Sequence, residues 1–203
     1  MAITYLLIVF FILLFSITMH EFAHGWIAYK LGDPTPKDRG RLTLNPFAHI
    51  DLIGTIVVPF LIVFISRGLL PPIGRAKPIP INPSHFKNPK QDMMLVGAAG
   101  PLTNIAIAIV FILLAKVSSP LISEILAFGA VLNLVLAIFN LIPIPPLDGS
   151  RIVAGLLPSR QYQAYRKIER FGFFILIPFI FLIIATGLFG KIINFLQKIV
   201  YSL

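Results

Sequence analysis

The sequence has no cysteine and little charge. Among its 203 residues, Asp, Glu, Lys and Arg together make up 12%. Soluble domains carry about 25% charged residues, so this composition excludes an ordinary soluble domain. The absence of cysteine excludes disulfides and thiolate metal sites, and a bound metal must therefore be held by His, Asp, Glu or backbone groups.

Apolar residues take the place of charge. They make up 57% of the chain, which includes 18 Phe and has a mean hydropathy of +0.91. Long, largely apolar runs without a charge occupy residues 3–17, 105–115 and 173–185. The water-soluble core of so short a chain cannot bury three such runs, so we expect a multi-pass protein of a cell membrane, surrounded by the lipid bilayer.

The net charge is +9, but the cations do not indicate nucleic acid. No stripe of Lys and Arg interleaved with aromatic residues occurs, and 14 of the 17 cations lie in residues 28–50, 67–90 and 151–170. The positive-inside rule places these three segments in the cytoplasm, with the N-terminus and the turn near Lys116 outside. We therefore expect no nucleic-acid partner.

Apolar runs and helix-breaking residues predict the helices. Residues 52–65 are apolar but shorter than the roughly 20 residues of a spanning helix, and they contain Gly54 and Pro59, so we expect a short or re-entrant helix there. The last helix is amphipathic and is expected to lie in the membrane interface. The other predictions are core helices at about 3–31, 93–115 and 122–141, and C-terminal helices at about 171–186 and 190–202.

Two polar segments predict strands. Residues 41–44 alternate in polarity, and residues 77–82 alternate with prolines, before which the α conformation is disfavoured. The predicted fold is therefore an all-α polytopic membrane protein, with about four to six transmembrane or re-entrant helices and short membrane-associated β-strands. We expect residues 1–203 to form a single intramembrane domain.

The strongest motif is the HExxH sequence at residues 20–24, on a segment that is helical for independent reasons. The four-residue spacing puts the imidazoles of His20 and His24 on one face of the helix, one turn apart, where they can share one Zn²⁺ per chain. Glu21 lies beside them and can take a proton from water. Ionisable residues within a membrane helix are costly and mostly functional, which favours the zinc interpretation.

Zinc needs a third protein ligand. The metzincin pattern would place a His six residues after His24, where this chain has Lys30, so that class is excluded. Of the acidic candidates, Glu124 begins a helix on the predicted outer side and Glu169 lies in a basic segment. Asp148 is favoured, because it follows a proline-broken helix that ends on the same side as the two histidines.

Two candidates have structural alternatives. Asp148 is also suited to be the N-cap of a short helix that starts near Gly149. His49 lies near Asp51 in a turn region, where a structural hydrogen bond is favoured over a role in binding metal or substrate.

Three motifs together resemble the site-2 proteases, which are intramembrane zinc metalloproteases of peptidase family M50. They are the HEFAH sequence at 20–24, the GPLTN sequence at 100–104 and the NLIPIPPLDG sequence at 140–149. The resemblance covers roughly residues 10–155, and segments 40–51 and 76–83 are similar to those of compact bacterial and archaeal members. The PDZ and CBS domains of larger relatives have no counterpart, so the resemblance does not extend to tethered substrate selection or nucleotide sensing.

The resemblance implies a role for each matching residue. The implied zinc ligands are His20, His24 and Asp148. Glu21 is implied as the general base and acid, and Asn140 as a residue that stabilises the oxyanion or positions the substrate. Asn104 would face the catalytic helix.

The substrate implied is a transmembrane protein or peptide. A transmembrane helix hides its amides in internal hydrogen bonds, so it must unwind locally before cleavage. Pairing with an exposed strand at residues 77–82 would stabilise the extended form. The residues expected to position substrate are Asn104, Lys77, Ile79, Ile81 and Asn82.

The predicted function is hydrolysis of peptide bonds within or near transmembrane segments, by an active site that opens toward the cytoplasm. The alternative is a membrane metal transporter or metal-sensing scaffold, in which the same His, Glu and Asp side chains form a transport site. It is disfavoured because the sequence has no second repeat half and Glu21 has a ready catalytic role. The sequence leaves the oligomeric state open.

Overall fold

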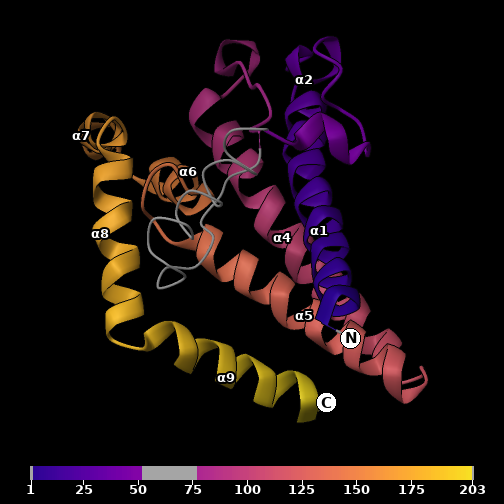
Figure 1. Ribbon diagram of the computed structural model, residues 1–203. Coiled ribbons are helices and arrows are strands. Elements are labelled where there is room, and N and C mark those ends of the chain that lie inside the picture. Colours follow the sequence, from indigo (N-terminus) through magenta and orange to yellow (C-terminus); the bar gives the residue numbers. More distant parts are fainter. Residues whose placement is uncertain (1, 52–76, 203) are drawn as a thin grey trace.

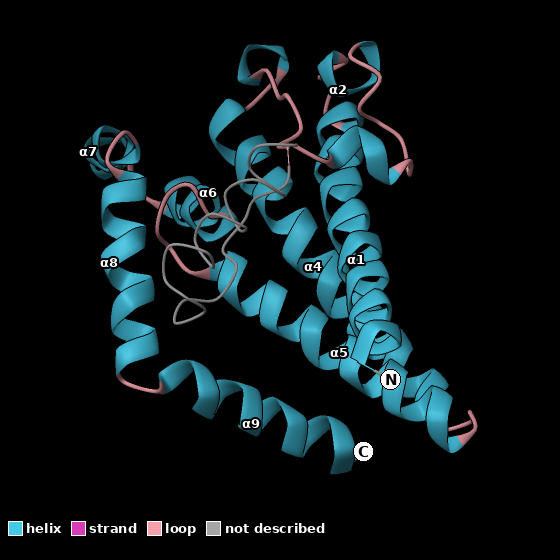
Figure 2. Cartoon of the chain, in the orientation of Figure 1, coloured by secondary structure: helices cyan, strands magenta, loops and turns pink. Residues whose placement is uncertain are grey.

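The computed structural model describes residues 2–51 and 77–202, and all regular structure within these ranges is helical (Figure 2). The long helices are α1 (Ala2–Lys30), α4 (Pro89–Ala115), α5 (Pro120–Leu141), α8 (Gly172–Ala185) and α9 (Leu188–Ser202). The short ones are α2 (Thr35–Asp38), η1 (Pro46–His49), η3 (Pro83–His85), α6 (Asp148–Leu156) and α7 (Ser159–Glu169). The segment predicted to be re-entrant, residues 52–65, lies outside the described residues.

The predicted β-strands are wrong: no strand occurs in residues 2–51 or 77–202. Residues 41–44 instead form a bend against α2, where the amides of Arg41 and Leu42 both donate to the Pro36 carbonyl, at 2.8 and 3.1 Å. Alternation in polarity was the only strand signal in this segment. The segment lies beside a turn and not beside another strand.

Residues 77–82 lack a strand for a different reason. Pro78 and Pro80 have no N–H, so this segment cannot complete a ladder of hydrogen bonds with a neighbouring strand. Three of its remaining amides have acceptors outside any strand. Lys77 donates to the His49 carbonyl at 3.0 Å, Ile79 to the Glu21 carboxylate at 3.2 Å and Asn82 to the Asp33 carboxylate at 2.7 Å.

Three helices are long and apolar enough to cross a membrane: residues 7–30 of α1, and the whole of α4 and α5. α7 and α8 meet at a bend of 78° and count as a fourth crossing if the pair is one span. α9 has 15 residues and a length of about 22 Å, which is too short to span the hydrocarbon core.

α4 lies at the centre of the fold and packs against α1, α5 and α6 (Figure 1). Small residues allow the close approach, as is usual between helices in membranes. At Gly97 a Cβ would lie 2.8 Å from the Arg151 Cβ on α6, and at Gly129 it would lie 2.7 Å from the Phe111 ring on α4. This packing brings the C-terminal half of α1 close to the start of α6.

Candidate metal centre

His20 and His24 lie on one face of α1 and point toward α4 and α6. Their Nε2 atoms are 3.0 Å apart, and the residues are 8% and 3% exposed. This is the arrangement expected of two histidines separated by one helical turn. Neighbouring α1 residues on the opposite side, such as Phe11 and Phe15, are exposed, so the polar face of α1 is the buried one.

Asp148 brings a carboxylate to the same point from a distant part of the chain. Its Oδ2 lies 3.1 Å from the His20 Nε2 and 3.2 Å from the His24 Nε2, although Asp148 and His24 are 124 positions apart. Asp148 is the first residue of α6, and the N-cap residue is Leu147, so the alternative role of helix cap does not apply. Arg151, one turn later, lies 3.6 Å from the other carboxylate oxygen.

Gly149 makes this placement of Asp148 possible. A Cβ at position 149 would overlap the backbone carbonyl of Leu141 at the end of α5. The chain between the two helices carries Pro143, Pro145 and Pro146, which prevent α5 from continuing. α6 therefore starts directly beside the end of α5, with Asp148 turned toward α1.

The three side chains fit a zinc ion. Their ligand atoms all lie within 4.8 Å of one another, and their mutual distances of 3.0 to 3.2 Å are close to the roughly 3.3 Å between ligands of a tetrahedral zinc with bonds near 2.05 Å. Gly100 leaves the necessary space, because a Cβ there would lie within 2.5 Å of the His20 Nε2. Two imidazoles and one carboxylate are a donor set typical of catalytic zinc, which keeps its fourth position open.

Each histidine also has a partner on its other ring nitrogen. The His24 Nδ1 lies 2.6 Å from the Val96 carbonyl, which can only accept, so this nitrogen carries the proton. The His20 Nδ1 lies 2.5 Å from the Asn104 Oδ1. In both rings the neutral imidazole then presents an unprotonated Nε2 to the common point, which is the form that binds a metal.

Asn104 is fully buried on α4, and its amide nitrogen donates to the Asn133 Oδ1 on α5 at 2.9 Å. Asn133 in turn donates to Ser16 on α1 at 2.9 Å. Neither Asn133 nor Ser16 was predicted from the sequence to belong to the site. A signal for Asn133 was present, because a lone amide in the middle of an apolar spanning segment is costly unless it is hydrogen-bonded.

Glu21 lies next to the cluster of His20, His24 and Asp148 but is not part of it. Its Oε2 accepts a hydrogen bond from the Ile79 amide at 3.2 Å. Arg41 approaches the same segment and donates to the Lys77 carbonyl at 2.7 Å. Burial lowers the pKa of Arg41, and the negative charge of Glu21 opposes this shift. The Glu21 carboxylate therefore lies close enough to the Arg41 guanidinium to favour its charged form.

Asp33 holds the other end of this segment. Its buried carboxylate accepts from the Asn82 amide at 2.7 Å, from the His85 Nδ1 at 2.8 Å and from both the amide and the hydroxyl of Thr35. Burial alone would raise the pKa of Asp33, but the hydrogen bonds from His85, Thr35 and Asn82 outweigh it, and the pKa lies below its usual value. Residues 77–82 are thus fixed at both ends, with Ile79 against Glu21 between them.

Other residues selected from the sequence lie elsewhere. Glu124 and Glu169 are exposed and do not belong to the metal-ligand cluster. His49 is buried and donates from Nε2 to the Thr43 carbonyl at 2.8 Å, which is a structural hydrogen bond. Asn140 is half-buried, and its amide donates to the Leu136 carbonyl of its own helix at 3.0 Å.

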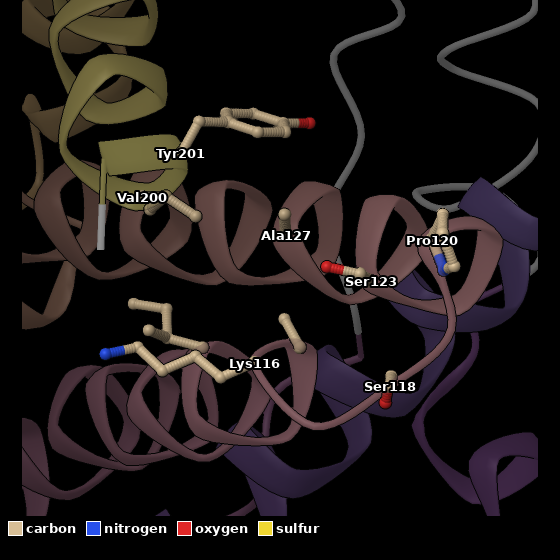
Figure 3. Close-up of a pocket in the computed structure, with 9 residues that line it drawn as sticks. Lys116, Ser118, Pro120, Ser123, Ala127, Val200 and Tyr201 are labelled. Atoms are coloured by element: carbon tan, nitrogen blue, oxygen red, sulfur yellow. The ribbon is translucent and has the colours of Figure 1, made fainter.

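A cavity of about 430 Å³ lies between the predicted outer ends of α4 and α5 and the end of α9 (Figure 3). Its lining includes Lys116, Ser123 and Tyr201, but no His, Asp or Glu. It is therefore a separate space from the cluster of His20, His24 and Asp148.

Comparison with known proteins gives one family. The family model described as Peptidase family M50 matches residues 115–184, which include Asn140 and Asp148. A protein of Bacillus subtilis (strain 168) named "Putative zinc metalloprotease YwhC" is 40% identical over 174 residues, which are 80% of this chain and 75% of that protein. No solved structure matches the chain.

More distant relatives carry similar names. "Putative zinc metalloprotease Rip2" of Mycobacterium tuberculosis (strain ATCC 25618 / H37Rv) is 30% identical over 87% of this chain and 66% of its own length. "Zinc metalloprotease MJ0392" of Methanocaldococcus jannaschii is 32% identical over 76% of this chain. That alignment covers 35% of the archaeal protein, so this chain spans only part of its length.

Proposed function

The chain belongs to peptidase family M50 and is an intramembrane zinc metalloprotease, and we propose that it hydrolyses peptide bonds within or near the transmembrane segments of membrane proteins. The observation that carries the proposal is the meeting of His20, His24 and Asp148 at one buried point beside Glu21. Three such ligands and an adjacent carboxylate are what peptide hydrolysis by zinc requires.

Each side chain has a role in the proposed reaction. His20, His24 and Asp148 would hold the zinc, which supplies Lewis acidity that polarises the scissile carbonyl and acidifies water. Glu21 accepts a proton from the attacking water and returns it to the amine that leaves. The Ile79 amide, which donates to the Glu21 Oε2, keeps this carboxylate oriented.

We assign substrate contacts to residues that remain accessible near Glu21. Lys77 is exposed, and Ile81 and Asn82 are half-buried, so their side chains can face an unwound substrate. The Ile79 side chain is only 6% exposed and packs toward α1, so its contribution is the amide on Glu21. Asn140, at the end of α5, is proposed to position the substrate near the scissile bond.

Asn104 receives a different role from the one expected. It is fully buried, and its side chain is committed to His20 on one side and to Asn133 on the other. Both polar atoms of this side chain already have a partner. We therefore assign Asn104 to the orientation of His20.

The active site is proposed to open toward the cytoplasm. The positively charged segments support this orientation, since they follow α1, precede α4 and follow α5. Single cysteines in this cysteine-free chain test it. Thiols at Ser84 and Ser159 should react with an impermeant reagent only from the cytoplasmic side, and a thiol at Ser119 only from outside. Labelling of Ser84 from the exterior would overturn the proposed orientation.

The decisive experiment compares zinc content and peptide cleavage in the wild type and in Glu21→Gln, purified in detergent with a transmembrane substrate. The amide keeps the shape of Glu21 but cannot accept the proton, so we expect one zinc per chain and a loss of cleavage of at least about 10²-fold. Glu124→Gln, an exposed change distant from the site, is the control and should leave both unchanged. Unaltered cleavage by Glu21→Gln would contradict the proposal, and metal flux without cleavage in the wild type would favour transport.

A further inference from the structure

A chain of buried polar side chains runs away from the metal centre through three helices. The His20 Nδ1 pairs with Asn104 on α4 at 2.5 Å, Asn104 with Asn133 on α5 at 2.9 Å, and Asn133 with Ser16 on α1 at 2.9 Å. Ser16 ends the chain on the Ile12 carbonyl at 2.7 Å. Ser16, Asn104 and Asn133 are each 0% exposed.

The direction of every hydrogen bond follows from the end of this chain. A carbonyl can only accept, so the single hydroxyl proton of Ser16 goes to Ile12, and Ser16 must accept from Asn133. The Asn133 nitrogen also donates to the Gly129 carbonyl at 2.9 Å, which uses its second proton. The Asn133 oxygen is thereby turned toward α4.

The same reasoning continues to the histidine. Because Asn133 presents oxygen, the Asn104 nitrogen must face it and the Asn104 oxygen must face His20. His20 then donates from Nδ1, and a neutral imidazole has no second ring proton. Its bare Nε2 points at the His24 Nε2 and the Asp148 Oδ2.

We propose that Asn133 and Ser16 are positioning residues that hold Asn104 in the orientation which presents the unprotonated His20 Nε2 to zinc. This inference rests on the proposed function and extends it to two residues that touch neither metal nor substrate. A comparison with His24 shows why His20 needs Asn133 and Ser16 behind Asn104. Its Nδ1 pairs directly with the Val96 carbonyl, which cannot turn around, whereas the amide of Asn104 can present either oxygen or nitrogen.

The competing explanation is that the polar chain only joins α1, α4 and α5. Buried amides do join helices in membranes, and a purely structural role would be lost on any apolar substitution. The two explanations differ in whether the direction of the hydrogen bonds matters. An acceptor-only side chain at position 104 would face His20 with oxygen whatever residue lies behind it.

The test is a double-mutant cycle of Asn133→Leu and Asn104→Asp, with the zinc dissociation constant measured by chelator competition on purified apo-protein. In the wild-type background, Asn133→Leu should weaken zinc binding about tenfold, the lower end of the range for partners that orient metal ligands. In the Asn104→Asp background the same change should have no effect or should tighten binding, because a carboxylate needs no orientation. Ser16→Ala should have a smaller effect, since the Gly129 carbonyl still fixes Asn133.

The control is Ser123→Ala. Ser123 lies on α5, as Asn133 does, but beside the separate cavity, so this change should leave zinc affinity unchanged (Figure 3). Thermal unfolding in detergent is measured for every variant, to separate zinc affinity from stability. A tenfold loss that persists in the Asn104→Asp background, or an unchanged affinity of folded Asn133→Leu, would overturn the inference while leaving the protease intact. Absence of tight zinc binding in the wild type would instead overturn the proposed function.

Discussion

The core of α1, α4, α5 and α6 and the C-terminal pair α8 and α9 both expose large apolar side chains, but they differ in what they bury. In the core, polar side chains are buried and apolar side chains such as Phe11 face outward. In the C-terminal pair, large apolar side chains are exposed, including Phe174 at 77%, Phe195 at 62% and Leu182 at 60%. Lipid is the common reason, because it makes exposed apolar surface cheap and buried polar groups costly.

This contrast separates function from packing. Among the polar side chains that the core buries, those of His20, His24 and Asp148 meet at one point, and those of Asn104, Asn133 and Ser16 lead to it through hydrogen bonds. The few buried residues of α9, Leu196 and Val200, join a purely apolar cluster with Ala108, Ala127, Ala130 and Val131. We therefore expect substitutions in the core to change metal binding and catalysis, and substitutions in the C-terminal pair to change stability at most.

The largest effect is expected from Asp148→Ala. This change removes the one ligand that comes from α6 and leaves two imidazoles, so the protein should purify without stoichiometric zinc and show no detectable cleavage. Metal analysis and a cleavage assay check it, with Asp38→Ala, an exposed change on α2, as the matched control. If Asp148→Ala keeps its zinc and its activity, Asp148 is not a ligand and the contrast between the two regions fails at its most important residue.

An intermediate effect is expected from Asp33→Asn, which leaves one accepting oxygen. With that oxygen on Thr35 and His85, an NH₂ group faces the Asn82 amide. Residues 77–82 would lose one of their two fixed ends, so cleavage should fall about tenfold while zinc content stays at one per chain. Leaving a buried hydrogen-bonding group unsatisfied costs about 1 to 3 kcal/mol. We therefore expect Asp33→Asn to lower the free energy of unfolding at pH 7 by about that amount.

The pH dependence of this loss follows from the lowered pKa of Asp33. A carboxylate whose pKa is lower in the folded than in the unfolded protein stabilises the fold at pH values above the unfolded-state pKa of about 3.9. This stabilisation is lost as the pH falls through the pKa of the folded state. The stability difference between wild type and Asp33→Asn should thus be full at pH 7 and shrink below about pH 4, measured by unfolding of zinc-free protein. A difference that grows on acidification would contradict the assigned role of the carboxylate.

The smallest effect is expected from Phe174→Ala on α8, because this side chain faces lipid in both the folded protein and the membrane-inserted unfolded chain. Stability should change by less than about 0.5 kcal/mol, with zinc content and cleavage unaltered. Leu196→Ala, in the same pair of helices but 6% exposed, should cost about 2 kcal/mol by leaving a cavity. Equal losses of stability from the two substitutions would contradict this expectation, because Phe174 would then have to pack against protein and not face lipid.

Physical reasons explain why the sequence could predict that His20, His24 and Asp148 lie together. A four-residue spacing puts His20 and His24 on one helical face, and the prolines before Asp148 end α5 where a new helix can start. Apolar runs likewise identified the long helices. The observed bounds differ by a few residues: α4 begins at Pro89, four residues before the predicted start at 93, because its first turn is polar.

The remaining features depend on contacts between distant segments. Residues 77–82 were predicted to be a strand. Instead, the amides of Ile79 and Asn82 donate hydrogen bonds to the side chains of Glu21 and Asp33. No sequence pattern indicates these contacts. Asn133 and Ser16 could have been flagged as polar residues in apolar helices. Their direction of hydrogen bonding could not, since it depends on which helix faces which.

The central claim is that His20, His24 and Asp148 bind one zinc ion, and X-ray absorption at the zinc edge of purified wild-type protein tests it most directly. The account predicts one zinc per chain, with two imidazole nitrogens and a carboxylate oxygen at about 2.0 to 2.2 Å and one further light-atom ligand. Folded protein without stoichiometric zinc, or a zinc ion surrounded by three or more imidazoles, would contradict it.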